Sequence, residues 1–446
     1  MKGFFIFIYS KDKGWCVNMK KKEINVGMLG LGTVGQGVLG ILRKNQEFIN
    51  EGVRPYKIIV KKIVDKNKKI TLGNKNDYEI LTDSAEEVIN DPDIDIVVET
   101  IGGFEPSRSL ILQALKTGKH VVTANKEVVA KAGYEIISLA KKNKVHFLFE
   151  ASVASAIPII GAFSRSLTSY PIMEIAGILN GTTNYILTKM SEEGREYAEV
   201  LKEAQEKGFA EADPGKDVDG FDSLYKIFIL SMIAFKARIN LDDIYCEGIR
   251  NISKTDIEYA RELGYKVKLL ALAENRNREL NIKVHPVLLP EKHRLASIGG
   301  AYNGILTRGN GFGDLIFSGL GAGALPAGSM IVSDIIEIVK NYDNYNSKFK
   351  YFKEKKVKDF KQTYSSYYLR IRVKDRPGVF AEIAGSFAEK KVSFASVIQK
   401  GEVGEIVDIV FLTHKAKEGN IQEALKKVVG LSCVEKICNV IRVVEI

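Results

Sequence analysis

The sequence predicts an α/β protein in which a doubly wound parallel sheet is followed by an α+β domain and a small C-terminal domain. Three observations predict this arrangement. In residues 23–150, short apolar runs alternate with helical patterns, which is typical of βαβ units and a parallel sheet. Residues 151–318 mix longer strands with helices, as expected of a catalytic or dimerisation domain. Residues 365–446 have the order β-α-β-β-α-β, which is ferredoxin-like.

The first domain begins with an apolar run that leads into a glycine-rich turn and a helical pattern. Its expected strands are residues 24–29, 58–64, 94–99, 120–123 and 145–149. Its expected helices are residues 38–48, 84–89, 106–116 and 126–141.

The second domain starts with a strand, and three helices and three further strands come after it. The expected strands are residues 172–179, 282–289, 301–306 and 311–317, and the expected helices are residues 183–190, 197–207 and 220–235. Residues 319–340 begin with glycines, continue as a helix over 330–339, and are expected to complete the first domain.

Residues 341–364 are rich in Lys, Asn and Tyr with weak periodicity, and we expect a linker there. In the C-terminal domain the expected strands are residues 368–373, 393–399, 405–413 and 434–444, with a turn at 401–404. The expected helices are residues 379–390 and 421–429.

The charge distribution argues against a nucleic-acid partner. Lys and Arg total 65 and Asp and Glu total 55, a net charge of +10. Residues 1–22 contribute +5 and residues 341–361 contribute +4, so the rest of the chain is nearly balanced. The apolar run at 4–9 is too short for a signal peptide or a membrane span. Met19 stands just before three lysines and a predicted strand, so residues 1–22 read as a disordered leader or a misassigned start. We expect no membrane partner.

The four cysteines have neither metal-ligand nor disulfide-framework spacing, so we expect a cytoplasmic protein. The five histidines are scattered without a cluster. Any proton transfer is therefore expected to fall to another type of side chain.

Gly30, Gly32 and Gly35 form a GxGxxG motif between a predicted strand and a predicted helix. The first glycine allows a tight turn, the second lets the backbone approach a pyrophosphate, and the third lets the helix pack close to the strand. This context predicts dinucleotide binding, as opposed to a glycine-rich turn without a ligand.

Two further positions are expected to face the same crevice, since ligands bind at the carboxyl ends of parallel strands. Thr100 follows one strand and Lys126 follows the next. A cation at a helix N-terminus opposes the helix dipole, which suggests a counter-charge from a ligand.

Asp65 ends the second strand and favours NAD, whereas the lysines around it favour the 2′-phosphate of NADP. The cofactor choice therefore stays open.

The densest polar cluster runs from Glu211 to Lys226 and contains five carboxylates in its first twelve residues. Asp222 and Lys226 are four residues apart and so share one helix face. A surface salt bridge is the simpler explanation, but the mixed charges suit a zwitterionic substrate, with carboxylates on its ammonium and a lysine on an oxygen.

Five motifs together resemble homoserine dehydrogenase, and Asp375-Arg-Pro-Gly378 with its surroundings resembles an ACT regulatory domain. The motifs are Gly30-Leu-Gly-Thr-Val-Gly-Gln-Gly-Val38, Thr123-Ala-Asn-Lys126, Glu150-Ala-Ser-Val153, Leu179-Asn-Gly-Thr-Thr-Asn-Tyr-Ile-Leu187 and Glu211-Ala-Asp-Pro with Asp217-Val-Asp-Gly-Phe-Asp222 and Lys226. The resemblance covers residues 23–446 and implies a Rossmann-like NAD(P)-binding domain. It further implies the reversible reduction of L-aspartate 4-semialdehyde to L-homoserine, a step toward threonine and methionine.

The resemblance also implies roles for single residues. Lys226 matches the proton donor to the aldehyde oxygen, with Asp222 beside it, and Lys126 matches the lysine near nicotinamide and substrate. Substrate-contacting positions match Glu211, Asp217, Asp222 and Thr182, and dinucleotide contacts match Gly32, Thr33, Val34 and Gly323.

A structural sodium site of the family uses backbone carbonyls, and the corresponding residues here are Glu150, Val153, Ser155 and Ile157. This segment has Ala and Ser where the family usually has glycines. The ACT-like domain implies feedback by an amino acid, with threonine the natural candidate. Its expected effector loop is Asp375, Arg376, Pro377 and Gly378, at the N-terminus of a helix. A homodimer or homotetramer is expected.

The sequence leaves two alternatives open. One is a catalytically silent amino-acid-sensing protein that kept the dinucleotide fold, and the other is a different amino-acid dehydrogenase.

Overall fold

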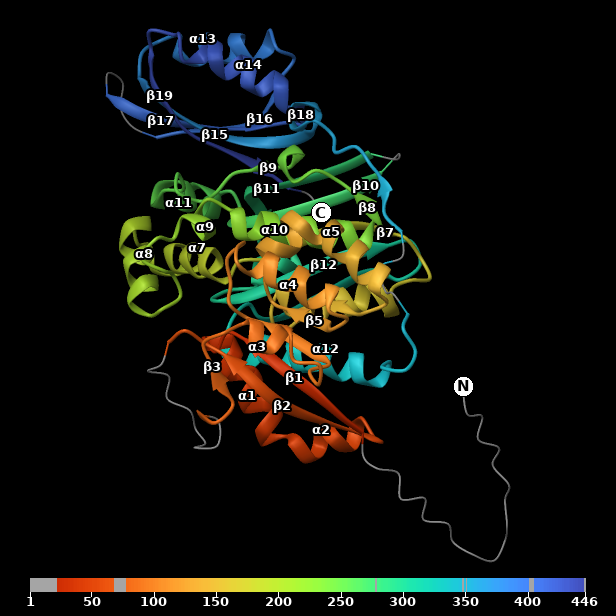
Figure 1. The fold of residues 1–446 in the computed structure, drawn as a ribbon. Helices are drawn as coiled ribbons and strands as arrows, with labels where there is room; N and C mark the ends of the chain where they lie inside the picture. The colour runs from red at the N-terminus through yellow and green to blue at the C-terminus, as the bar shows by residue number, and fades with distance from the viewer. Residues whose placement is uncertain are drawn as a thin grey trace, which may run out of the picture.

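The computed structural model describes residues 22–67, 78–276, 279–346, 349, 351–400 and 405–444. The expected leader and the expected turn at 401–404 lie outside these residues, apart from Lys22. Figure 1 shows three layers of chain, with the N-terminal sheet at the bottom, a second sheet in the middle and the C-terminal domain at the top.

The N-terminal sheet is parallel and has the order β3-β2-β1-β4-β5-β6. This is a doubly wound parallel sheet, as the sequence predicts. The order in which strands are added switches from one side of β1 to the other between β1 and β4, and sheets of this kind bind ligands at that point. The strands are β1 (Lys22–Leu29), β2 (Tyr56–Val64), β3 (Leu81–Thr82), β4 (Ile96–Glu99), β5 (His120–Thr123) and β6 (Phe147–Leu148). The helices are α1 (Thr33–Lys44), α2 (Gln46–Gly52), α3 (Glu86–Ile89), α4 (Ser107–Lys116) and α5 (Lys126–Asn143).

The continuous helix expected over 38–48 is wrong. The chain forms α1 and α2, and Asn45 separates them with φ −111° and ψ 21°, outside the helical region. The short side chain of Asn competes with the helical backbone, so Asn commonly stands at helix ends.

Helix α12 (Ala324–Lys340) returns to the first domain and packs against α1 (Figure 1). Two glycines allow the close approach. A Cβ atom on Gly37 would lie 2.1 Å from the carbonyl oxygen of Ala324, and one on Gly328 would lie 2.8 Å from the carbonyl carbon of Gly37. The two helices are nearly 300 residues apart in the chain, so local sequence patterns could not predict their contact.

We expect Gly37→Ala to lower the free energy of unfolding by about 1–3 kcal/mol, because the added methyl group meets backbone that cannot move aside. Gly40→Ala in the same helix is the matched control, since a Cβ there meets nothing within 4 Å. The control is expected to stabilise the protein by about 0.5–1 kcal/mol. Urea unfolding of both variants measures the difference, and equal effects would show that α1 and α12 are not in tight contact.

The second sheet is mixed and continues into the C-terminal domain, in the order β13-β12-β7-β10-β11-β19-β15-β17-β16. Its first five members are β7 (Ile172–Ile178), β10 (Tyr265–Arg276), β11 (Glu279–Pro290), β12 (Tyr302–Gly309) and β13 (Gly313–Leu320). The helices of this region are α7 (Gly181–Glu193), α8 (Tyr197–Glu206), α9 (Gly215–Val218), α10 (Phe221–Ala234) and α11 (Lys254–Glu262). The sequence analysis missed β10 and α11.

The C-terminal domain has the predicted ferredoxin-like arrangement. Its strands pair in the order β19-β15-β17-β16, and two helices cover one face. The elements are β15 (Tyr364–Lys374), α13 (Val379–Ala388), β16 (Phe394–Gln399), β17 (Ile406–Thr413), α14 (Glu418–Val428) and β19 (Val434–Val443). Because β19 also pairs in parallel with β11 at Val287 and Leu288, the two domains share one sheet.

The segment expected as a linker is attached to the second domain and the parallel-sheet domain at several of its described residues. Within it β14 (Lys353–Glu354) pairs with β8 (Ala237–Arg238), and Phe349 stacks on Phe149 with ring centroids 5.1 Å apart. Val357 forms an isolated bridge with Leu280. These contacts fix the path of the chain between the second and third domains.

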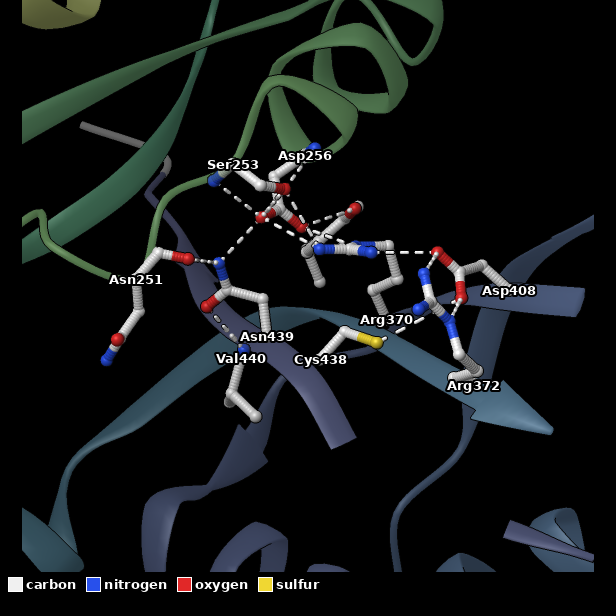
Figure 2. Close-up of polar contacts among 10 residues, drawn as sticks. Asn251, Ser253, Asp256, Arg370, Arg372, Asp408, Cys438, Asn439 and Val440 are labelled. Atoms are coloured by element: carbon white, nitrogen blue, oxygen red, sulfur yellow. Dashed lines mark hydrogen bonds and ion pairs between the residues drawn. The ribbon is translucent and has the colours of Figure 1, made fainter. Parts of the chain in front are cut away.

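A buried charge network joins the C-terminal domain to α11 (Figure 2). Arg370 of β15 donates from Nε to Oδ1 of Asp256 at 2.7 Å and from Nη1 to Asp408 at 2.7 Å. The Asp256 carboxylate also accepts from Asn439 at 2.9 Å and from Ser253, the N-cap of α11. Asp256 is fully buried and Arg370 nearly so, so each charge depends on the other.

Candidate active site

A crevice of about 660 Å³ opens where the parallel sheet meets the second domain. Its walls come from the turn after β1, the end of β4, the start of α5 and the segment 211–225. The predicted site residues that line it are Gly32, Thr33, Val34, Thr100, Lys126, Glu211, Asp217 and Asp222. The structure thus places residues from distant parts of the sequence around one cavity.

The glycine motif forms the tight turn that the sequence predicts. Gly30 has φ +95°, and a Cβ there would lie 2.9 Å from the Thr100 backbone. A Cβ on Gly35 would lie 2.4 Å from the Gly30 carbonyl oxygen. Gly32 is the N-cap of α1 and has no side-chain cap, so the first N–H groups of the helix point to the crevice without an internal acceptor. This geometry suits an anion such as a pyrophosphate.

Asp65 lies against this turn. Its Oδ2 accepts the N–H of Leu31 at 2.7 Å, and its Oδ1 accepts the N–H of Asn67 at 2.8 Å. The carboxylate therefore holds the glycine turn and stands at the end of β2, where a ribose would lie.

Lys126 and Asp222 line the crevice, whereas Lys226 is not among the lining residues and lies behind Asp222, so the three form a chain of charges. Nζ of Lys226 donates to Oδ2 of Asp222 at 2.7 Å and to the carbonyl oxygen of Leu179 at 2.7 Å. Nζ of Lys126 lies 2.5 Å from Oδ1 of the same carboxylate. Asp222 and Lys226 are buried, whereas the Lys126 side chain is 43% exposed. The pair is therefore not the surface salt bridge that the spacing alone allowed.

The structure shows what balances the charge of Lys126 at the N-terminus of α5. The sequence analysis suggested a ligand as the counter-charge, but Asp222 of α10 already supplies one. The attraction of this carboxylate raises the pKa of Lys126.

The electrostatics of the two buried groups differ. Burial opposes the charge of Asp222, but Lys226 and Lys126 outweigh this effect and hold its pKa below the ordinary value. Burial lowers the pKa of Lys226, with Asp222 opposing the shift and Lys126 adding to it. An ammonium whose pKa falls toward neutrality is a better proton donor and its amine a usable acceptor.

We expect opposite pH profiles for the two directions of an aldehyde–alcohol interconversion at this site. Donation requires the ammonium of Lys226, so kcat for reduction should fall as the pH rises through its pKa; oxidation requires the neutral amine, so its kcat should rise there. Because the pKa of Lys226 is lowered, both changes should occur below the ordinary lysine range. Rates in both directions, with unfolding followed over the same pH range, check this; parallel profiles would contradict it.

Asn180 is a site residue that the sequence reasoning did not single out. Its Nδ2 donates to Asp217 and to Asp222, each at 2.8 Å, and its Oδ1 accepts the N–H of Thr183 and caps α7. One buried amide thus holds two carboxylates of the site at a fixed separation. Its place directly after the strand ending near 178 was the available signal, because an N-cap asparagine fixes the first turn of the next helix.

Glu99 was also missed. This fully buried carboxylate ends β4, and it accepts the N–H groups of Ile101 and Gly102 and the hydroxyl of Thr123. It fixes the backbone that forms one wall of the crevice.

The remaining predicted residues lie around these groups. Burial raises the pKa of Asp217, and the neighbouring charge of Asp222 adds to the rise. Thr182 is not among the lining residues, and its hydroxyl donates to the carbonyl oxygen of Phe209 at 2.6 Å. Gly323 is the N-cap of α12 with φ +130°, next to the α1 contact.

The segment expected to hold sodium forms a strained turn. Ala154 and Ser155 have φ values of 56° and 41°, which L-residues rarely adopt. The carboxylate of Glu150 accepts the N–H groups of Ile160 and Gly161 at 2.8 and 2.7 Å, so it points to α6 (Ile159–Gly161). Within the described residues no cluster of three or more His, Cys, Asp or Glu side chains is placed to hold a metal.

The expected effector loop precedes α13. The N–H of Asp375 donates to the Glu405 carbonyl oxygen at 2.8 Å, and Arg376 pairs with Glu382 at 2.8 Å. Gly378 is the N-cap with φ +93°, in the left-handed region. Arg376 is therefore paired within the domain.

Over the part of the chain that the structure describes, no helix is long and apolar enough to cross a membrane.

Comparisons with known proteins agree with this geometry. Residues 30–150 match the family described as homoserine dehydrogenase, NAD binding domain; residues 158–336 match homoserine dehydrogenase, and residues 367–430 match the ACT domain. A homoserine dehydrogenase from Synechocystis is 41% identical, covering 95% of this chain and 100% of that protein. The crystal structure of a homoserine dehydrogenase from Thiobacillus denitrificans has a TM-score of 0.89 at 39% identity, covering 95% of this chain and 99% of that one. A hyperthermophilic archaeal homoserine dehydrogenase in complex with NADPH has a TM-score of 0.62 at 28% identity, covering 73% and 100%. The chain belongs to the homoserine dehydrogenase family, with an NAD-binding domain and an ACT domain.

Proposed function

We propose that Lys226 is the general acid and base of the homoserine dehydrogenase reaction, the reversible NAD(P)-dependent reduction of L-aspartate 4-semialdehyde to L-homoserine. The observation that carries this proposal is the buried Lys226 ammonium, held by Asp222 and the Leu179 carbonyl beneath the crevice. The cofactor, when bound, supplies or accepts the hydride. Lys226 donates a proton to the aldehyde oxygen in reduction and takes it back from the hydroxyl in oxidation.

The other charges of the crevice would hold the substrate. Glu211 and Asp217 offer carboxylates to its ammonium group, and Lys126, which lines the crevice and pairs with Asp222, offers its ammonium to an oxygen. Thr182 acts by positioning the chain near Phe209, because its hydroxyl is already engaged. Asp222 accepts a hydrogen bond from Lys226 and forms an ion pair with Lys126, so its charge stabilises both cations.

This arrangement disfavours a silent sensing protein. Such a protein has no need for a buried Lys226 ammonium that costs desolvation energy. The first test is the change in nicotinamide absorbance with purified protein and L-homoserine, with NAD and NADP in separate reactions. Turnover would support the proposal, and nucleotide binding without turnover would contradict it.

For the cofactor we propose that Asp65 favours NAD over NADP, because its carboxylate stands at the end of β2 and would repel a 2′-phosphate. The NADPH bound by the archaeal relative shows that the phosphate is tolerated in that protein. Asp65→Asn keeps an acceptor for the Leu31 N–H and removes the charge. We expect it to raise the ratio of kcat/KM for NADP to kcat/KM for NAD by about tenfold. A tenfold change corresponds to about 1.4 kcal/mol, and the repulsion between two adjacent negative charges exceeds that. An unchanged ratio would assign the choice to the lysines around position 65.

We further propose feedback through the ACT domain by an amino acid, with threonine the natural candidate, and the loop Asp375–Gly378 as one place for its carboxylate. The shared sheet between β11 and β19 supports a mechanical link between the domains.

A homodimer or homotetramer is proposed as well. The exposed pair Tyr302 on β12 and Leu320 on the edge strand β13 supports a subunit contact, because such edges are normally covered.

A sodium ion is proposed on the carbonyl oxygens of Glu150, Val153, Ser155 and Ile157. The left-handed conformations of Ala154 and Ser155 support it, because the turn forms without glycines. Carbonyl oxygens are hard ligands that suit such a cation.

We also propose that the protein acts in the cytoplasm. The thiols of Cys246, Cys433 and Cys438 are free, which fits a reducing compartment.

A further inference from the structure

Lys283 of β11 is unusual among the buried lysines. Lys119, Lys226 and Lys268 each donate to at least two oxygen atoms of the protein. Lys283 is 6% exposed, and among the described residues its ammonium has no hydrogen bond or ion pair. It lies only over the ring of Phe360, with Nζ 5.9 Å from the centroid. The side chain lines a cleft, where an anion that met the ammonium would form an ion pair partly shielded from water.

The Lys283 side chain lines a cleft of about 640 Å³ between the central sheet and the C-terminal domain. The central sheet contributes Glu274 and Lys283, and the C-terminal domain contributes Ser366, Thr413, His414 and Lys415. A cleft of this volume is within the usual range for small-molecule sites. A ligand bound there would contact both domains at once.

The charges of the cleft indicate which class of ligand fits. Burial lowers the pKa of Lys283 to about 8, with Arg442 and Lys415 opposing its charge and Glu274 and Glu418 favouring it. At neutral pH the ammonium therefore stays mostly protonated. Glu274 lies in the same cleft, and its contacts are long, 3.4 Å to Asn281 and 3.9 Å to Arg276. Glu174, Arg276, Lys358 and Lys415 also line the cleft, so both signs of charge are present. A zwitterion can therefore satisfy Lys283 and Glu274 together, whereas inorganic phosphate could pair with the cations alone.

We propose that the cleft between the central sheet and the ACT domain binds a free amino acid, with the carboxylate on Lys283 and the ammonium on Glu274. The site rests on the proposed regulation and differs from the loop Asp375–Gly378.

The cleft is connected to the active site through backbone. Lys283 pairs with Tyr245 between β11 and β9 (Tyr245–Cys246), and the N–H of Glu247 donates to Val284. Two residues on, the N–H of Ile249 donates to the Val218 carbonyl at 2.8 Å, directly beside Asp217 on α9. Occupancy of the cleft would thus act on the segment that carries a substrate carboxylate.

The test compares the full chain with Lys283→Met, which keeps the length of the side chain and removes its charge. Thermal unfolding is measured with each of the twenty common L-amino acids, followed by titration calorimetry on those that raise the Tm. At least one amino acid should raise the Tm of the unchanged protein and bind Lys283→Met at least about tenfold more weakly, the effect of one lost charge-assisted hydrogen bond. Homoserine turnover without effector should stay the same, and the Tm of unliganded Lys283→Met should rise.

Two controls separate the explanations. Lys266→Met changes a lysine of β10 that does not line the cleft and should bind like the unchanged protein. Glu274→Gln should weaken binding of the same amino acid, and it replaces Lys283→Met if that variant does not fold. A binding response that persists in both cleft variants but disappears in Asp375→Ala would overturn the cleft and leave the regulation intact.

Two other results would also overturn the proposal. One is an absence of any amino-acid response in the unchanged protein, with homoserine turnover showing that the enzyme itself is sound. The other is a change of molar mass in Lys283→Met by light scattering, which would make the cleft a contact between subunits.

Discussion

Lys226→Ala is expected to lower kcat in both directions by a factor on the order of a hundred to ten thousand, the range for loss of a general acid–base group. The Lys226 ammonium lies between Asp222 and the Leu179 carbonyl. The neighbouring cation cannot replace it, since Lys126 is 43% exposed and engaged with Oδ1 of Asp222. Steady-state kinetics with L-homoserine and with the aldehyde measure the loss.

The matched control is Lys216→Ala. Lys216 also lines the crevice, but its side chain is 74% exposed and its only ion pair among the described residues is with Glu127. An exposed pair contributes little, so we expect kcat to change by less than about threefold. If Lys226→Ala retained kcat and raised only KM, Lys226 would bind substrate without transferring a proton.

Asp256→Ala is expected to have the largest effect on stability, a loss of about 3–5 kcal/mol in the free energy of unfolding. Removal of this carboxylate leaves Asp408 as the one counter-charge of Arg370 among the described residues, it removes the acceptor of the Tyr368 hydroxyl, and it leaves the Asn439 amide with the Asn251 carbonyl alone (Figure 2). It also removes half of the capping box of α11. Urea unfolding followed by circular dichroism measures the loss.

Glu262→Ala in the same helix is the control. Glu262 pairs with Lys400 at 2.6 Å, but the two side chains are 45% and 59% exposed. We expect a cost below about 1 kcal/mol. Equal losses in the two variants would show that the junction is held by the shared sheet and not by the buried charges.

Periodicity and turn chemistry predicted the parallel sheet well. β5 has the predicted bounds, and β1, β2 and α4 differ from the predicted ends by two residues or fewer. The alternation of apolar and helical patterns is a local property, so it survives folding. β10 was missed because its centre is an unbroken apolar run, which is buried on both faces and lacks the alternation that identifies a strand.

The site was predicted in its parts but not in its contacts. The spacing of Asp222 and Lys226 placed both on one face of a helix, and the structure joins them at 2.7 Å. The spacing did not show that the pair is buried, nor that Asn180 connects Asp217 to Asp222. Both facts depend on α7 and the 211–225 segment meeting, which no local pattern encodes.

The sequence by itself determined the alternation of strands and helices in the parallel sheet, the glycine turn and the chemical types of the site residues, because these depend on neighbours a few positions apart. Only the tertiary structure decided that Asp222 is the counter-charge of Lys126, that α12 returns to α1, and that Lys283 is buried without a partner among the described residues. Burial and counter-charges come from segments far apart in the chain. Desolvation and Coulomb attraction act through space, so they are fixed only when those segments pack together.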